Sequence, residues 1–153
     1  MKYLQLFPFV LLLICSRPAV AQHSEEEAVK SAIRQLFDGM KLGDSAMVKA
    51  AFYENPVLQT ALTAKDGSLR LVTASLEKFL TAVGTPHTDV WDERISFSKI
   101  LVDGPLASVW TPYSFYLNGK FAHCGVNSFQ LFKSPKGWKI IYLVDTRRKD
   151  DCL

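Results

Sequence analysis

The chain has 153 residues, of which 48% are hydrophobic and 22% are charged, with 18 Lys and Arg against 15 Asp and Glu. A chain of this length makes one ordinary domain with a core of its own. Because basic and acidic residues nearly balance, there is no electrostatic reason to expect nucleic acid or an anionic membrane as a partner.

Residues 1–21 have the three-part order of a secretory signal peptide. Lys2 gives the early positive charge, an apolar run follows, and Ala19-Val20-Ala21 is a small-residue cleavage site. The apolar run is shorter than the roughly 20 residues that span a bilayer. We therefore expect cleavage after Ala21 and a periplasmic or secreted single domain over residues 22–153, with no membrane attachment after cleavage.

Two helices are expected next, separated at Gly43-Asp44. Ser24 with Glu27 three residues later is a capping-box start, and the apolar residues that follow recur at helical spacing. Gly43 is a typical helix stop, and Asp44 is a typical N-cap for a second, shorter helix. The expected apolar faces comprise Val29, Ile33, Leu36, Phe37 and Met40 in the first helix and Met47, Val48, Ala51 and Phe52 in the second.

A hairpin, a third helix and four strands complete the expected order. Two short strand-like runs flank Asp66-Gly67, which is a hairpin signal, and a helix from about Thr73 ends at Gly84. From Trp91 onward the apolar period becomes two, with a turn signal between each pair of strands. The four strand segments read DERISFSKILV, LASVWTPYSFYL, KFAHCGVNSFQLFK and WKIIYLVDTRR.

This order predicts an α+β layer fold in which three N-terminal helices pack against a curved, mainly antiparallel sheet. It resembles the nuclear transport factor 2-like (SnoaL-like) superfamily, whose bent sheet and three helices form a cone with an internal pocket. The closer resemblance is to the secreted, lumazine-binding branch, on WDERI at 91–95, NGKFAHCGVNSFQL at 118–131 and GWKIIYLVDTRR at 137–148. This fold hosts isomerases, dehydratases, hydrolases and binding proteins, so the resemblance implies the fold and leaves the function open.

The turns allow the strand register to be estimated. A tight turn at Pro135-Lys136 places Lys133 opposite Trp138, and therefore Cys124 opposite Arg147 and Asn127 opposite Val144. The Asn118-Gly119 turn likewise places His123 near Ser114 and Asn127 near Trp110. A bulge at Pro112 would swap the two faces on one side of it, since proline gives no N–H to the ladder.

On this register one face of the sheet is aromatic with a few polar groups at one end, as in a ligand pocket. The expected ligand-binding residues are Trp110, Tyr116, His123, Asn127 and Tyr142. The opposite face, which includes Tyr113, Phe115, Cys124, Leu143 and Asp145, is also fairly apolar and could equally be a core face or a subunit contact.

Catalytic residues are not assigned by the sequence. His87, Asp92, His123 and Asp145 could contribute a His-Asp pair for acid-base chemistry, or the aspartates could simply pair with neighbouring arginines. The chain lacks Cys-x-x-Cys and His-x-x-x-His spacing, a P-loop and a dinucleotide fingerprint, so no metal site and no cofactor are expected.

His123 and Cys124 are adjacent in one strand and therefore point to opposite faces, which argues against a nucleophile-base pair. Cleavage of the signal peptide would leave two cysteines, Cys124 and Cys152, in an exported chain. The tail after Arg147 is long enough to fold back, so we expect a disulfide between them. The alternative is a buried free thiol at Cys124 and a loose surface thiol at Cys152.

The function expected from the sequence is binding of a small apolar or aromatic molecule in an aromatic-lined cavity. One alternative is a small-molecule isomerase, dehydratase or hydrolase that uses a His/Asp pair in the cavity. Another is a protein-interaction module. Both faces of the four-strand region are apolar, which also predicts a homodimer.

Overall fold

The computed structural model describes residues 18–152, so the expected signal peptide lies outside the described residues except for 18–21. Three helices and seven strands are formed by the described residues. They are α1 (Pro18–Leu42), α2 (Ser45–Ala51), β1 (Phe52–Thr63), β2 (Leu69–Ala74), α3 (Leu76–Gly84), β3 (Trp91–Ile95), β4 (Lys99–Asp103), β5 (Leu106–Leu117), β6 (Lys120–Ser134) and β7 (Gly137–Thr146).

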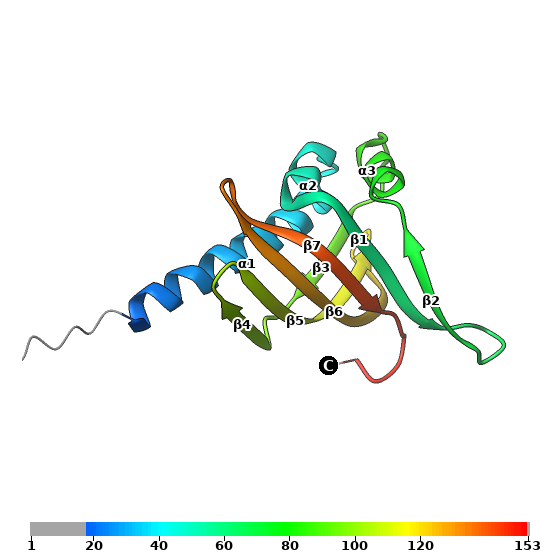
Figure 1. Cartoon of the computed structure of the whole chain (residues 1–153). Coiled ribbons are helices and arrows are strands. Elements are labelled where there is room, and N and C mark those ends of the chain that lie inside the picture. The colour runs from blue at the N-terminus through cyan, green and yellow to red at the C-terminus, as the bar shows by residue number, and fades with distance from the viewer. Residues whose placement is uncertain (1–17, 153) are drawn as a thin grey trace, which may run out of the picture.

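All seven strands belong to one sheet, in the order β2-β1-β7-β6-β5-β3, with β4 also paired to β5. β1 and β7 are parallel and the other pairs are antiparallel. Figure 1 shows α1 crossing one face of the sheet, with α2 and α3 together at one end of the strands. The α+β fold with a mainly antiparallel sheet agrees with the prediction, although α3 follows the β1–β2 hairpin and is not part of an N-terminal helical block.

The start of α1 differs from the prediction. Pro18, the first described residue, is already in α1, so Ser24 lies inside the helix instead of capping it. Ala19 and Ala21 are strong helix formers, which favours a helix that runs through the capping signal at Ser24.

The junction between α1 and α2 is confirmed. Gly43 has a φ of 68°, the left-handed conformation of a helix C-terminus. The Asp44 carboxylate accepts a hydrogen bond of 2.9 Å from the amide of Met47, which caps α2. A Cβ on Gly39 would lie 2.8 Å from the Val48 side chain, so the two helices pack closely here.

The segment DERISFSKILV forms two short strands, β3 and β4, where one was expected. Both pair with β5, and the chain between them bonds to β5 through the Ser96 amide to the Pro112 carbonyl and the Ser98 amide to the Trp110 carbonyl. Pro112 has no amide to return a bond, so the regular ladder is interrupted opposite it. α3 is also shorter than expected, since Ser75 caps it through the amide of Lys78.

The predicted register is correct beside the turns and is wrong by one residue farther from them. Lys133 lies opposite Trp138 as predicted, but Asn127 lies opposite Asp145 instead of Val144 because Ile141 is an extra residue in β7. In the β5–β6 pair His123 lies opposite Phe115 instead of Ser114, because Ala122 is extra in β6. The shift therefore comes from two single-residue bulges, neither of them at Pro112.

The core lies between α1 and the inner face of the sheet. Phe37 of α1 meets Phe129 of β6 edge to face, with ring centroids 6.2 Å apart. Both are buried, as are the neighbouring α1 residues on the same helical face. The sheet contributes Leu58, Ala107, Val109, Leu131, Trp138 and Ile140 to this core.

Candidate functional site

A cavity of about 140 Å³ remains between α1, α3 and the inner face of the sheet. Its apolar wall is formed by Leu36, Phe37, Met40, Leu58, Ala74, Phe79 and Leu143, and its polar wall by Gln59, Thr60, Glu93, Asn127, Asp145 and Arg147. Larger depressions exist, such as one of about 610 Å³ beside the β1–β2 hairpin, but they are shallow surface features. The small cavity is the candidate site because ionisable groups and aromatic side chains meet there.

Glu93 and Asn127 form one part of the polar wall. The Asn127 amide nitrogen donates a 2.8 Å hydrogen bond to the Glu93 carboxyl, and Asn127 is only 3% exposed. β3 and β6 lie on either side of β5 and bring the two side chains together on the inner face. Among residues 18–152, Asn127 is the only hydrogen-bond partner of the Glu93 carboxyl, and no basic side chain forms an ion pair with it.

Burial raises the pKa of Glu93 to about 7. Desolvation is the main cause, since a carboxylate loses water contacts that the protein replaces with one amide hydrogen bond. Asp145 raises the pKa further through charge repulsion, while Asn127 and Arg147 lower it. Glu93 is therefore close to half-protonated at neutral pH.

Asp145 forms the centre of a second polar group. Its carboxylate accepts hydrogen bonds from the Thr60 hydroxyl at 2.5 Å, the Arg147 guanidinium at 2.8 Å and the Tyr113 hydroxyl at 3.3 Å. Tyr113 also donates to the Thr146 carbonyl at 2.9 Å, and its pKa is raised by desolvation and by the neighbouring carboxylates. Asp145 is thus fully engaged, unlike Glu93.

The five residues predicted to bind the ligand are divided between the two faces of the sheet. Asn127 lines the cavity, whereas His123 is on the inner face but packs against the rings of Tyr113 and Phe115, outside the cavity lining. The two bulges place Trp110, Tyr116 and Tyr142 on the outer face instead. The prediction that all five share one face is therefore wrong.

The three outer-face residues make other contacts. Trp110 is 49% exposed. The Arg94 guanidinium carbon lies 4.1 Å from the centroid of the Tyr116 ring. The Tyr142 hydroxyl donates a 2.6 Å hydrogen bond to Gln59. Their part in ligand binding stays a prediction that no contact described here supports.

The candidate His/Asp groups are not brought together as a hydrogen-bonded pair. His87 stacks on Trp91, and Asp92 points away from the cavity to Lys41 and Arg94. Desolvation would raise the pKa of Asp92, but those two cations lower it overall. The pKa of His123 is lowered, mainly by desolvation. Within residues 18–152 no hydrogen bond joins a histidine to an aspartate.

Glu93 is the site residue that the sequence reasoning missed. It lies between Trp91 and Ile95 in a period-two strand, so its side chain shares their buried face. A carboxylate flanked in this way by two large apolar residues is the signal that could have identified it.

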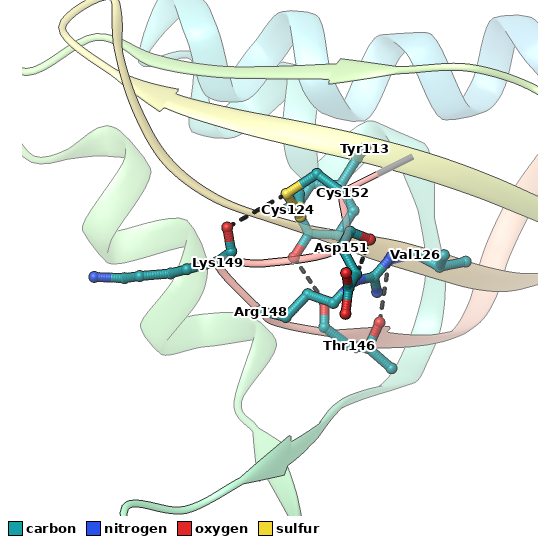
Figure 2. Close-up of a disulfide and its surroundings, with 8 residues drawn as sticks. All are labelled: Tyr113, Cys124, Val126, Thr146, Arg148, Lys149, Asp151 and Cys152. Carbon is teal, nitrogen blue, oxygen red and sulfur yellow. Dashed lines mark hydrogen bonds between the residues drawn. A yellow bond between two sulfur atoms is a disulfide. The ribbon is translucent and has the colours of Figure 1, made fainter.

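The predicted disulfide between Cys124 and Cys152 is confirmed, with the two Cα atoms 5.8 Å apart. Cys124 of β6 is buried, and its backbone exchanges two 2.9 Å hydrogen bonds with Arg148 (Figure 2). The register was expected to place Arg147 there, and the bulge at Ile141 accounts for the difference of one residue. The bond fixes the chain that follows Asp145 and Arg147.

Solved structures with this arrangement of helices and sheet identify the fold. An NTF2-like protein of unknown function from Shewanella baltica has a TM-score of 0.63 and 14% identity, covering 87% of this chain and 98% of that one. The chain has an NTF2-like fold. A second NTF2-like protein, with a cystatin-like fold, from Novosphingobium aromaticivorans has a TM-score of 0.64 and 10% identity, covering 86% of this chain and 87% of its own. At these identities the likeness concerns the fold alone.

A third solved structure is also similar to this chain, and no family is identified. A domain of unknown function from Nostoc punctiforme, with a cystatin-like fold, has a TM-score of 0.61 and 17% identity, covering 82% of this chain and 78% of its own. No protein-family model and no curated protein matches this chain.

The described part of the chain offers neither a metal-holding cluster nor a helix fit to cross a membrane. Within residues 18–152, no group of three or more His, Cys, Asp or Glu side chains is arranged to hold a metal ion. In the same range, no helix combines the length and the apolar composition needed to cross a membrane.

Proposed function

We propose that the chain binds a small molecule in the cavity between α1, α3 and the sheet. The observation that carries this proposal is the division of the cavity wall into an apolar part around Phe37 and Phe79 and a polar part at Glu93 and Asn127. A wall of this kind buries the body of a ligand and orients its polar group. The ligand is small, because the volume of about 140 Å³ is close to that of a cavity of about 150 Å³ that holds benzene in another protein.

Export to the periplasm or the cell exterior is part of this proposal. It is supported by the signal-like order of residues 1–21 and by the disulfide, since such bonds persist outside the reducing cytosol. Membership of the secreted, lumazine-binding branch is likewise a proposal, based on the sequence segments that resemble it.

A second candidate function is acid-base catalysis on a small molecule, with Glu93 as the proton-transferring group in place of the His/Asp pair. The Glu93 carboxyl faces the cavity beside an amide donor, and its pKa of about 7 is suited to proton transfer near neutral pH. Among the described residues, no histidine lines the cavity. Binding therefore remains the function that the geometry supports best.

Native mass spectrometry of the protein purified from its own host tests the binding proposal. We expect a retained small molecule on the wild-type chain, reduced or absent on Asn127→Leu, because leucine removes the amide of the polar wall. Trp110→Leu is the matched control, since Trp110 lies on the outer face and its loss leaves the cavity intact. Equal retention by Asn127→Leu, or loss only in Trp110→Leu, would contradict this location.

A further inference from the structure

The cavity wall carries an excess of acidic groups. It contains the carboxyl groups of Glu93 and Asp145 but only one basic side chain, Arg147. The Arg147 guanidinium donates to Asp145 at 2.8 Å, so its charge is already paired. Ionisation of Glu93 therefore leaves one negative charge in the wall without a partner among the described residues.

We propose that the ligand of this cavity is a small amine whose ammonium group pairs with the Glu93 carboxylate while its apolar body lies against Phe37, Met40 and Phe79. This inference rests on the binding function proposed above and names its ligand class. A cation supplied by the ligand balances the charge of the wall and gives Glu93 a charged donor in addition to the neutral amide of Asn127.

The same geometry disfavours an anionic ligand. An anion in the cavity would approach two carboxyl groups, and the one guanidinium would have to leave Asp145 to bind it. Asp145 is also held by the hydroxyls of Thr60 and Tyr113, which keep it oriented toward Arg147. A neutral apolar ligand would fill the cavity but leave the Glu93 carboxyl without a cationic partner.

Amine binding also has a proton signature. Glu93 holds its proton in part at neutral pH, and the other groups that act on it are Asp145 of β7 and Arg147 just after that strand, with Tyr113 of β5 and Asn127 of β6 nearby. α1 contributes only apolar side chains to this wall. An incoming ammonium group favours the carboxylate, so binding below the pKa of Glu93 releases a proton from it.

Three probes of similar shape and different charge test the proposal: benzylamine, benzyl alcohol and benzoate, measured by calorimetry on the full domain at about pH 8, where Glu93 is largely ionised. We expect benzylamine to bind at least about tenfold more tightly than benzyl alcohol, and benzoate most weakly. Glu93→Gln keeps the oxygen that accepts from Asn127 and should abolish the preference for the amine. The neighbouring Asp92→Asn removes the same charge outside the cavity and should preserve it.

A measurement on the wild-type chain alone guards against misfolded variants. Benzylamine titrations at about pH 6 in buffers of different ionisation enthalpy should show release of nearly one proton per ligand, falling toward zero at about pH 8. Equal affinity for the alcohol and the amine, tightest binding of benzoate, no binding of benzylamine, or no proton release would each overturn the amine assignment. In the first two cases the cavity still binds a small molecule, so the broader binding function would survive.

Discussion

The side-chain amide of Asn127 lies 2.8 Å from the carboxyl group of Glu93, which is 34 residues away in the sequence. This hydrogen bond joins β6 to β3 across the strand between them. A buried carboxyl group with one neutral donor is poorly compensated when it ionises, so stability and ligand binding both depend on its protonation.

The stability of the domain should depend on pH through Glu93. The folded-state pKa of about 7 lies above the ordinary value of 4.5, so the unfolded chain loses this proton first as pH rises. The contribution of Glu93 to stability is therefore complete below about pH 4.5 and is lost as pH rises through about 7, a change of about 3 kcal/mol. Glu93→Gln lacks this loss, so its unfolding free energy relative to wild type should rise by that amount between about pH 4 and 8.

Urea unfolding at a series of pH values measures this difference. Asp92→Asn is the matched control, because the pKa of Asp92 is lowered and its contribution has the opposite sign, being lost as pH falls. A difference between Glu93→Gln and wild type that stays constant with pH would show that the Glu93 carboxyl is not desolvated.

Asn127→Leu should destabilise the domain by about 1–3 kcal/mol, because it leaves the buried Glu93 carboxyl without its hydrogen-bond donor. The double variant Asn127→Leu with Glu93→Leu should recover part of the loss, since both polar groups are then removed. Thermal unfolding of the two single variants and the double variant gives the coupling between the residues. Strictly additive losses would contradict a direct hydrogen bond.

Thr111→Val should stabilise the domain by about 1 kcal/mol. Thr111 is fully buried on the inner face, opposite Asn127, and within the described part of the chain its hydroxyl has no hydrogen-bond partner. Valine has nearly the same shape and removes the cost of desolvating that hydroxyl. A lower midpoint of chemical unfolding for Thr111→Val would indicate a buried water bound to the hydroxyl.

Cys152→Ser should lower the unfolding free energy by about 3.5 kcal/mol, because the disulfide closes a loop with a sequence separation of 28. Wild type unfolded in the presence of a reductant provides the comparison and should lose a similar amount. Alkylation without reduction, followed by mass spectrometry, should label neither cysteine in the exported wild type. Two labelled cysteines would show that the bond does not form there.

A homodimer through the outer face of the sheet is also expected. Trp110 and Phe121 are 49% and 46% exposed on this side of the domain, and such aromatic side chains are typical of protein contacts. Sedimentation at concentrations on the order of tens of micromolar should show a dimer for wild type and a monomer for Trp110→Glu. Leu42→Glu, on the far end of α1, is the control and should remain dimeric.

The sequence predicts this fold well where a local signal determines the structure. Gly43 and Asp44 mark the end of one helix and the start of the next, and the Pro135-Lys136 turn places Lys133 opposite Trp138. The bulges at Ala122 and Ile141 have no comparable signal, because each residue suits a regular strand equally well. Together the two bulges place Trp110, Tyr116 and Tyr142 on the outer face, away from the cavity. The sequence therefore indicated those aromatic residues as the site and missed Glu93.

The parallel pairing of β1 with β7 has a consequence for the order of folding. β7 lies between β1 and β6 in the sheet, and the Thr60–Asp145 hydrogen bond joins residues 85 positions apart. The β1–β2 hairpin is made early in synthesis. It therefore cannot join the rest of the sheet until β7, the last strand, has left the ribosome. Contacts over such sequence distances form slowly, so the β1 edge that pairs with β7 stays exposed while β3, β4, β5 and β6 can already pair with one another.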